Sequence, residues 1–248
     1  MHIALGTPMF AAQCTLAFHR SVGALRSAIE RDGHKLSSIH IGNESLIHRA
    51  RNAIVWHFLQ GAASHLLWVD GDTGFEVGDI ARMVAANKPI IVAPCPMKAI
   101  NWERVATAVR AGVPANELER YTGYFNVVHK PGRQVIRADQ PFEIERGGTG
   151  LMLVQRQVFD AVAPLARTYL NKNHGSALPF GERVVHFHPS DVADDDLRSE
   201  DYGFCDLAKQ AGFAIWAAPW CEIAHVGTYT FRGSYQDCHR TTEEPDAH

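Results

Sequence analysis

The chain has 248 residues, of which 46% are hydrophobic and 21% are charged, and this is enough chain to bury a sizeable core. Its formal net charge is −3 at pH 7, so no overall basic excess indicates a nucleic-acid or membrane partner. The five cysteines are scattered and form no CxxC pair, which argues against a disulfide framework and a thiolate zinc site. We therefore expect a cytoplasmic protein. In agreement, the first residues lack the pattern of a signal peptide, and no apolar run approaches the ~18 residues that cross a bilayer.

Apolar runs of strand length alternate with segments of helical spacing along the first part of the chain. We expect strands at residues 2–5, 35–41, 65–69 and 89–93, and helices at residues 11–31, 45–60 and 77–87. Asn43 is the expected N-cap of the second helix, and Gly33 and Gly61 follow the first two helices as stop signals. This alternation predicts an α/β fold with a mixed, mostly parallel sheet flanked by helices.

Beyond Pro96 the pattern is less regular. We expect β-structure at residues 121–128 and 134–137, a strand at 151–155, a helix at 157–165, a long polar loop at 168–196, a helix at 200–210 and a strand at 214–217. Residues 241–248 are expected to form a disordered tail. The chain shows no internal repeat and no low-complexity linker, which favours a single domain over residues 1–240.

The first group of chemically interesting residues is Asp70-Gly71-Asp72, directly after an apolar run of strand length. Ligands of open α/β sheets bind beyond the carboxyl ends of the strands. Two acids separated by one small residue can hold a hard divalent cation and a ribose hydroxyl together. The alternative is a solvated acidic turn, because acidic pairs are common in turns.

The second group is the segment Ser199-Glu200-Asp201-Tyr202-Gly203-Phe204-Cys205. A serine followed by acids is a good start for a helix, because the serine caps it and the acids complement its dipole. The same carboxylates could act as a general base on a hydroxyl group, a role that needs a positioned acid or histidine.

Histidines form the third group. His225 follows an apolar pair near the end of the chain, in the segment His-Val-Gly-Thr-Tyr, but the chain has 14 histidines and most must be structural. His186 and His188 alternate as strand residues on one face would, yet no other residue of metal-ligand spacing accompanies them.

Taken in order, the motifs resemble those of GT-A glycosyltransferases, particularly the small soluble family 2 type and related bacteriophage enzymes. The ordered set is the apolar strand with its DxD, the Gly147-Gly148-Thr149-Gly150 turn, the Ser-Glu-Asp-Tyr-Gly-Phe-Cys helix start and the late His-Val-Gly-Thr-Tyr. The resemblance covers about residues 3–231. It implies a Rossmann-like GT-A fold with a nucleotide-binding half at about 1–98 and an acceptor half at about 99–240.

The resemblance also implies a metal site. Asp72 would bind Mn²⁺ or Mg²⁺, Asp70 would contact the ribose or the metal, and His225 would complete the metal shell. The ion would bridge both phosphates of the sugar nucleotide and neutralise the departing diphosphate.

Further roles follow from the same resemblance. Thr7 and Pro8 match the loop after the first strand that walls the nucleobase, and Arg49 and Asn52 match helix residues that face the nucleotide. Gly148 belongs to the turn that would let the backbone approach the donor sugar. For Arg49 and Asn52 the alternative is a basic, exposed helix face, and for the turn it is ordinary flexibility.

Asp201 matches the acid that inverting members use as a base, with Glu200 in support. Two departures bear on the function. The first strand ends in Gly-Thr-Pro-Met and not in the Pro-x-Tyr-Asn of family 2, which leaves the nucleobase contacts open. No Gln-x-x-Arg-Trp follows the Ser-Glu-Asp segment, which favours transfer of a single sugar over processive synthesis. A late metal-binding histidine also occurs in retaining members, so both stereochemical outcomes stay open.

The expected activity is transfer of one sugar from a nucleotide-sugar, preferably a UDP-sugar with GDP as the alternative, to a hydroxyl acceptor. That acceptor is either a glycan or a hydroxymethylated base in phage DNA. Two other classes stay open: a sugar-nucleotide hydrolase or nucleotidyltransferase, which would also need paired acids and a metal, and a catalytically silent nucleotide-sugar-binding module.

Overall fold

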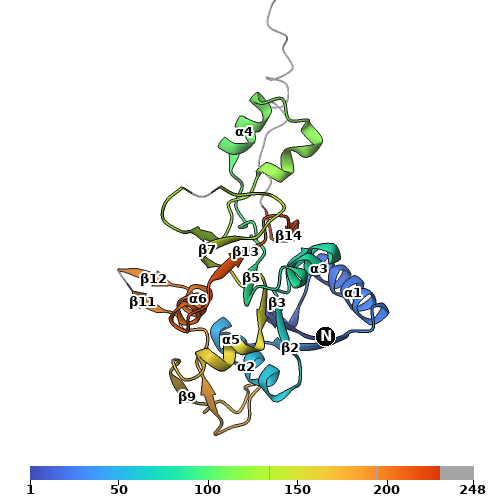
Figure 1. The fold of residues 1–248 in the computed structure, drawn as a ribbon. Helices are drawn as coiled ribbons and strands as arrows, with labels where there is room; N and C mark the ends of the chain where they lie inside the picture. Colours follow the sequence, from blue (N-terminus) through green and yellow to red (C-terminus); the bar gives the residue numbers. More distant parts are fainter. Residues whose placement is uncertain (134, 194, 230–248) are drawn as a thin grey trace, which may run out of the picture.

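The fold is built on an eight-stranded mixed sheet, seen in a computed structural model that describes residues 1–133, 135–193 and 195–229 (Figure 1). The strand order is β2-β1-β3-β8-β5-β13-β7-β6, and all strands except β7 and β8 run in the same direction. This confirms the predicted mixed, mostly parallel sheet. The strands are β1 (His2–Met9), β2 (Lys35–Gly42), β3 (His65–Val69), β5 (Ile90–Val92), β6 (Val127–His129), β7 (Phe142–Gly147), β8 (Leu151–Gln155) and β13 (Ile215–Ala217).

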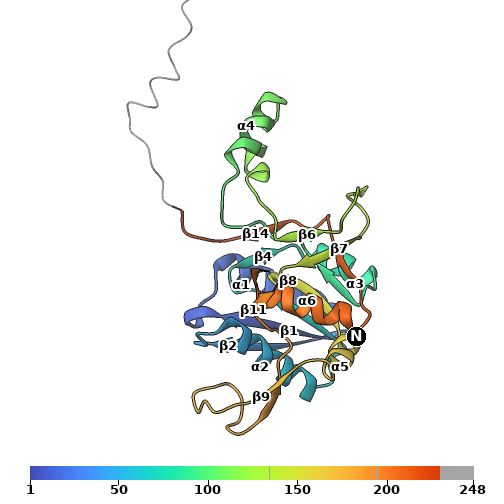
Figure 2. The same ribbon diagram turned by 90° about the vertical axis from the view of Figure 1, so that its left-hand side faces the viewer.

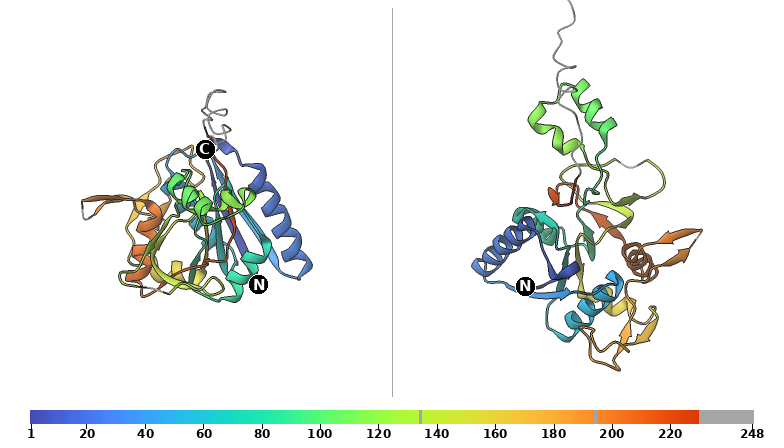
Figure 3. Two further views of the ribbon diagram at one scale, coloured as in Figure 1. Left: turned by 90° about the horizontal axis from the view of Figure 1, so that it is seen from above. Right: turned by 180° about the vertical axis from the view of Figure 1, so that it is seen from behind.

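Helices cover both faces of this sheet. α1 (Leu16–Arg31) and α3 (Val77–Ala85) lie on one face, and α2 (Ile47–Gln60), α5 (Arg156–Val162) and α6 (Glu200–Gln210) lie on the other (Figure 3, left). Because successive strand side chains point to opposite faces, β3 contributes to both cores. Leu66 and Trp68 pack with α2, whereas Leu67 and Val69 pack with α1.

The starts of the first two helices differ from the prediction. α1 begins only at Leu16, because the Thr15 side chain caps it and a short 3₁₀ turn, η1 (Phe10–Ala12), comes before. The N-cap of α2 is Leu46 and not Asn43. Asn43 has a positive φ of 59°, a left-handed conformation that asparagine tolerates better than most residues, and this turns the chain before α2 begins.

An arm projects from the body between β5 and β6, with α4 (Trp102–Arg110) and the 3₁₀ segment η2 (Ala115–Tyr121) (Figures 1 and 2). The expected β-structure at 121–128 is therefore wrong over most of its length, since only Val127 and Val128 are in β6. Within the described residues, 135–137 form no strand, and Gln134 lies outside them. Val135 is 87% exposed, so its apolar side chain has no sheet partner to pack against.

Short hairpins replace much of the expected loop at 168–196. β9 (Thr168–Leu170) pairs with β10 (Arg183–Val185), and β11 (Asp191–Ala193) pairs with β12 (Asp196–Arg198). A further ribbon joins β4 (Thr73–Phe75), just after the DxD, to β14 (Ile223–His225). The expected tail at 241–248 lies outside the described residues. In the part that is described, no helix is both long and apolar enough to cross a membrane.

Candidate functional site

The Asp70-Gly71-Asp72 turn lies at the carboxyl edge of the sheet, where β3 ends between β1 and β8. Two segments hold it in place. The Asp70 N–H donates to the Gly150 carbonyl at 3.0 Å, and the Thr15 N–H donates to the Gly71 carbonyl at 2.8 Å. The Gly-Gly-Thr-Gly turn and the segment just before α1 therefore both contact the DxD.

A buried arginine that the sequence analysis did not single out joins the two acidic motifs. Arg51 is only 3% exposed, and its Nη2 lies 3.3 Å from Asp70 Oδ1 and 3.6 Å from Asp201 Oδ1. Its Nε lies 3.3 Å from Glu200 Oε1, and its guanidinium stacks over the Trp68 ring at 5.5 Å. Burial alone would lower the pKa of Arg51, but the carboxylates outweigh it and raise that pKa. Arg51 is therefore a permanent cation among three acids.

The sequence carried a signal for Arg51. Residues 51, 55 and 58 share one face of α2 at a spacing of four and three, and Val55 and Phe58 are core residues. A charged residue on the apolar stripe of a helix needs a buried partner. Asp70 and the two acids at the start of α6 are that partner.

The environment of Asp70 is strongly perturbed. Burial raises its pKa, the Arg51 guanidinium lowers it, and the neighbouring Asp201 and Asp72 carboxylates raise it again, to a net value of about 6. Such crowding of buried acids is a common property of functional sites. The Thr149 hydroxyl, which is fully buried, donates to Asp201 Oδ1, the same oxygen that faces Arg51.

Asp72 and His225 face each other across the β4–β14 ribbon, with His225 Nε2 3.5 Å from Asp72 Oδ1. His225 Nδ1 lies 2.7 Å from the Pro96 carbonyl oxygen, which can only accept a hydrogen bond. Nδ1 therefore carries the proton, and in the neutral ring the Nε2 lone pair points toward Asp72. Lys98 donates to the other carboxylate oxygen of Asp72.

These contacts perturb the pKa of both partners. Burial would raise the pKa of Asp72, but hydrogen bonds from His225, in its protonated form, and from Lys98 outweigh it and hold that pKa at about 2. The hydrogen bond with Asp72 raises the pKa of His225, although burial opposes it. Asp72 is consequently a carboxylate at every ordinary pH.

The donor set bears on the predicted metal. Within the described residues, no group of three or more His, Cys, Asp or Glu side chains is arranged to hold an ion. The structure brings Asp72 and His225 together, while Asp70 faces Arg51. One carboxylate and one imidazole nitrogen fit Mn²⁺ better than Mg²⁺, which prefers oxygen ligands. The remaining coordination positions would fall to oxygens of a bound ligand and to water.

Two of the predicted nucleobase contacts lie inside β1 and not in a loop after it. Thr7 and Pro8 belong to this strand, which continues beside β2 and is longer than the residues 2–5 expected from the sequence. Thr7 is fully buried, and its hydroxyl has no hydrogen-bond partner among the described residues. The expected first strand ends at Leu5 because Gly-Thr-Pro is a turn signal, but parallel pairing with β2 continues the strand to Met9.

Gly148 lies against Asn126. A Cβ atom at position 148 would stand 2.4 Å from the Asn126 side-chain nitrogen, so any larger residue would displace the Asn126 side chain. Asn126 Oδ1 in turn accepts a hydrogen bond from the Tyr202 hydroxyl at 2.6 Å. The glycine turn is thereby linked to the start of α6 as well as to the DxD.

The other two predicted contacts on α2 are engaged elsewhere. Arg49 binds both carboxylate oxygens of Glu44 through Nε and Nη2. Asn52, only 1% exposed, donates from Nδ2 to His186 Nδ1 at 2.8 Å and accepts the His188 N–H at 3.2 Å. On α2 it is Arg51, between these two residues, that reaches the DxD.

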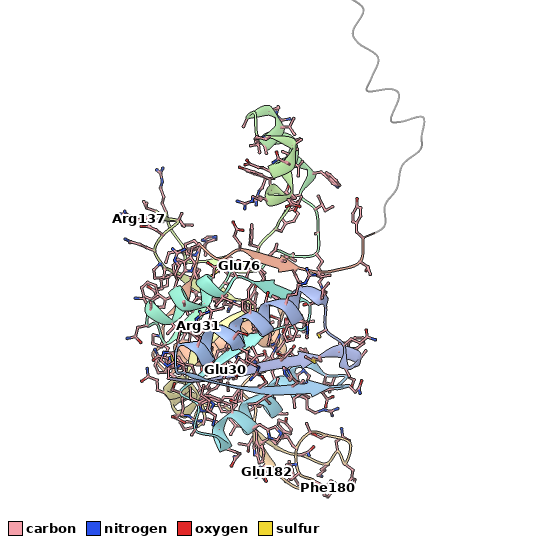
Figure 4. All side chains as sticks on the ribbon, turned by 90° about the vertical axis from the view of Figure 1, so that its right-hand side faces the viewer. Glu30, Arg31, Glu76, Arg137, Phe180 and Glu182 are labelled. Carbon is pink, nitrogen blue, oxygen red and sulfur yellow. The ribbon has the colours of Figure 1, made fainter. Side chains whose placement is uncertain are left out.

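A cleft of about 1,050 Å³ opens beside the Asp72–His225 pair, beneath the arm. Lys98 and His225 line it together with apolar and charged residues of the arm, of α1 and of the β4–β14 ribbon, and Glu76, the N-cap of α3, lines it as well (Figure 4). Its volume is at the upper end of the range typical of small-molecule sites.

No protein-family model matches the chain, and no curated protein matches its sequence. Among solved structures, it is similar to A197 from STIV, with a TM-score of 0.50 and 11% identity over 92% of this chain and 87% of that one. GalNAc-T7, solved with UDP, GalNAc and Mn²⁺, gives a TM-score of 0.49 and 10% identity over 92% of this chain and 43% of that one. A glycosyltransferase involved in the glycosylation of the major capsid of PBCV-1 gives 0.32 and 11%, over 73% and 72%. At such identities the likeness concerns the fold alone, a mixed, mostly parallel sheet flanked by helices, in agreement with the predicted α/β class.

Proposed function

We propose that the chain is a metal-dependent glycosyltransferase that moves one sugar from a nucleotide-sugar to a hydroxyl acceptor. One observation carries the proposal: three motifs far apart in sequence converge at the carboxyl edge of the sheet. Arg51 joins the Asp70 side of the DxD to Glu200 and Asp201, and His225 faces Asp72 on its other side. A solvated acidic turn or a charged helix start would not need such a buried connection.

Asp72 and His225 would hold the divalent ion, Mn²⁺ in preference to Mg²⁺. When bound, the ion would neutralise the diphosphate leaving group as a Lewis acid. The Nδ1–H bond to Pro96 supports this assignment, because it keeps the Nε2 lone pair of His225 aimed at Asp72. Lys98 can add a second positive charge on the same side. We propose a UDP-sugar as the donor, with GDP as the alternative, from the resemblance of the motifs.

Asp201 would act as the general base. Its carboxylate would take the proton of the acceptor hydroxyl while the hydroxyl oxygen bonds to the anomeric carbon and the bond from that carbon to the phosphate oxygen breaks. Displacement from the opposite face inverts the anomeric carbon. Thr149 and Arg51 hold Asp201 in one orientation, and Glu200 shares Arg51 with it. A base that is fixed in place loses little entropy when the acceptor arrives.

The remaining predicted contacts complete the donor site in this proposal. Asp70 would accept a ribose hydroxyl, Thr7 and Pro8 would lie along the nucleobase, and Gly148 would allow the turn to approach the donor sugar. Arg49 and Asn52 would contact the nucleotide only if they gave up their present hydrogen bonds, which Arg49 makes with Glu44 and Asn52 makes with His186 and the His188 backbone. The acceptor is a glycan or a hydroxymethylated base of phage DNA, and we favour a glycan because the chain has no overall basic charge.

Replacement of the base tests this assignment. Asp201→Asn should leave donor binding within about twofold of wild type and lower transfer by about 10²–10⁴-fold, the usual contribution of a general base. Asp160→Asn, an exposed residue of α5, is the matched control and should keep full transfer. Donor affinity is measured by calorimetry, and transfer is measured as diphosphate release over a panel of acceptors.

Several outcomes would contradict the proposal. Full transfer in Asp201→Asn would remove the base assignment. Release of free sugar at the same rate with and without any acceptor would favour a hydrolase, and donor binding without turnover on every acceptor would favour a silent binding module.

A further inference from the structure

A second pocket, of about 530 Å³, lies between the first turn of α2 and the β9–β10 hairpin. Its lining residues are His48, Arg49, Tyr169, Leu170, Asn171, Lys172, Asn173 and His186. The hairpin is at the end of the molecule opposite the arm, and Phe180 and Glu182 mark it in Figure 4. The pocket shares no residue with the cleft beneath the arm.

The lining is rich in hydrogen-bond donors and contains no carboxylate. Lys172 is exposed and makes no ion pair within the described part of the chain. Arg49 is held by Glu44 through Nε and Nη2, which uses two of its five N–H groups and leaves three as donors. Glu44 itself is not part of the lining.

His186 is fixed as a donor by its neighbour. Asn52 Oδ1 accepts the backbone N–H of His188, so Asn52 must present its amide nitrogen to His186 Nδ1, 2.8 Å away. Nδ1 of His186 is then the acceptor, and the proton of the neutral ring is on Nε2. Burial lowers the pKa of His186, in agreement with a neutral ring. A neutral imidazole with its N–H directed away from Asn52 can donate to an anion without carrying charge.

The loop that carries Lys172 is held in place by its flanking amides. Asn171, only 3% exposed, donates to the Leu178 and Pro179 carbonyls at 3.0 and 2.9 Å. The Asn173 side chain accepts the Gly175 N–H at 3.0 Å. The backbone of Lys172 is therefore positioned before any ligand arrives, which lowers the entropy cost of binding.

We infer that this pocket binds the phosphate group of a small phosphorylated ligand, such as a sugar phosphate. A phosphate offers several acceptor oxygens and about two negative charges, which match one free cation, three guanidinium N–H groups and one imidazole N–H. A nucleic acid would need an extended basic track, whereas this pocket is confined and contains only two permanent cations. The inference goes beyond the proposed transfer reaction and does not depend on it.

The test is titration of the full chain with inorganic phosphate, sulfate and glucose 6-phosphate in EDTA. Binding is measured by calorimetry and by changes in the imidazole NMR signals of His48 and His186. We expect glucose 6-phosphate to bind more tightly than inorganic phosphate and to shift both histidine signals. Lys172→Ala and His186→Phe should each weaken binding about tenfold. Lys35→Ala removes an exposed lysine outside the pocket and should leave binding unchanged.

Asp72→Ala separates this inference from the proposed function, because it should abolish metal-dependent donor binding and leave phosphate binding intact. Three results would overturn the inference. One is the absence of any binding at millimolar phosphate or sugar phosphate in folded protein. Another is equal affinity in wild type, Lys172→Ala and His186→Phe. The third is displacement of the phosphate by UDP in EDTA, which would assign the pocket to the donor. Equal affinity for inorganic phosphate and glucose 6-phosphate, with both variants weakened, would keep the phosphate site and identify free phosphate as its ligand.

Discussion

Arg51 is the buried cation that joins the acids of the candidate site, and Arg51→Met tests how much the folded state depends on it. The substitution keeps a long side chain but leaves Asp70, Glu200 and Asp201 without the cation that lies 3.3–3.6 Å from each. Removing one partner from a buried ion pair costs about 3–5 kcal/mol. For a chain of this size, 1 kcal/mol corresponds to about 2–4 °C, so we expect Tm to fall by roughly 6–20 °C.

The same substitution should change how stability depends on pH. Arg51 lowers the pKa of Asp70, which is about 6 with the arginine present, so its loss raises that pKa further. A carboxyl group whose pKa is raised by folding favours the folded state at low pH and loses that contribution as pH rises through the folded pKa. The stability deficit of Arg51→Met should therefore be largest above about pH 7 and smaller near pH 5.

Urea denaturation of wild type and variant between about pH 5 and 8 measures this deficit. Arg31→Met is the control, because Arg31 is exposed on the outside of α1 (Figure 4) and its ion pair with Asp32 should contribute less than about 1 kcal/mol. A Tm within about 2 °C of wild type, or a deficit that does not change with pH, would refute the electrostatic account of Arg51.

Two further predictions concern the metal pair and the start of α6. His225 must be neutral to bind a metal, and its hydrogen bond with Asp72 raises its pKa. When the pH is lowered, Mn²⁺ affinity should therefore start to decrease at a pH that is still above about 6.5, the ordinary pKa of histidine. A flat calorimetric profile between about pH 5.5 and 8 would count against ligation by His225. In α6, Gly203→Ala would place a Cβ 1.9 Å from the Pro189 carbonyl oxygen, and we expect a loss of more than about 4 kcal/mol or no folding. Gly78→Ala in α3 meets no atom within 4 Å and should be neutral or stabilise by up to about 1 kcal/mol; equal Tm values for the two variants would contradict the contact.

Much of the central fold could be predicted because its strands are buried and its helices are amphipathic. The run His65–Val69 was predicted with its correct ends, since four of its five residues are fully buried and no polar residue interrupts it. The start of α6 was predicted as well, because Ser199 caps it and two acids follow. Strong local signals and burial agree at both places.

The arm and the hairpins could not be predicted, for physical reasons. α4 leaves Trp102 62% and Val109 53% exposed, so its apolar residues do not mark a face packed on the core. β9 and β10 have three residues each, which is too short for an alternating pattern to be recognised. In such segments the structure depends on tertiary contacts.

Sequence motifs point to the acids of the candidate site, and the structure adds the cation that lies between them. The motifs point to Asp70, Asp72 and Asp201, whereas on α2 the resemblance points to Arg49 and Asn52 and not to Arg51. A basic residue in a helix usually faces solvent, and only the position of Arg51 in register with the apolar stripe showed otherwise. Motifs identify the chemistry of a site more easily than the residues that position it.

The most direct test of the central claim is a thermal-shift screen of UDP-, GDP-, ADP- and CMP-sugars, each with Mn²⁺ and with EDTA, on wild type and Asp72→Ala. A donor at about 100 times its Kd stabilises by about 2.7 kcal/mol, which corresponds to roughly 5–11 °C for a chain of this size. We predict such a shift with one nucleotide family, in wild type and with Mn²⁺ only. No shift with any donor in folded protein, or an equal shift in Asp72→Ala, would contradict a metal-dependent donor site.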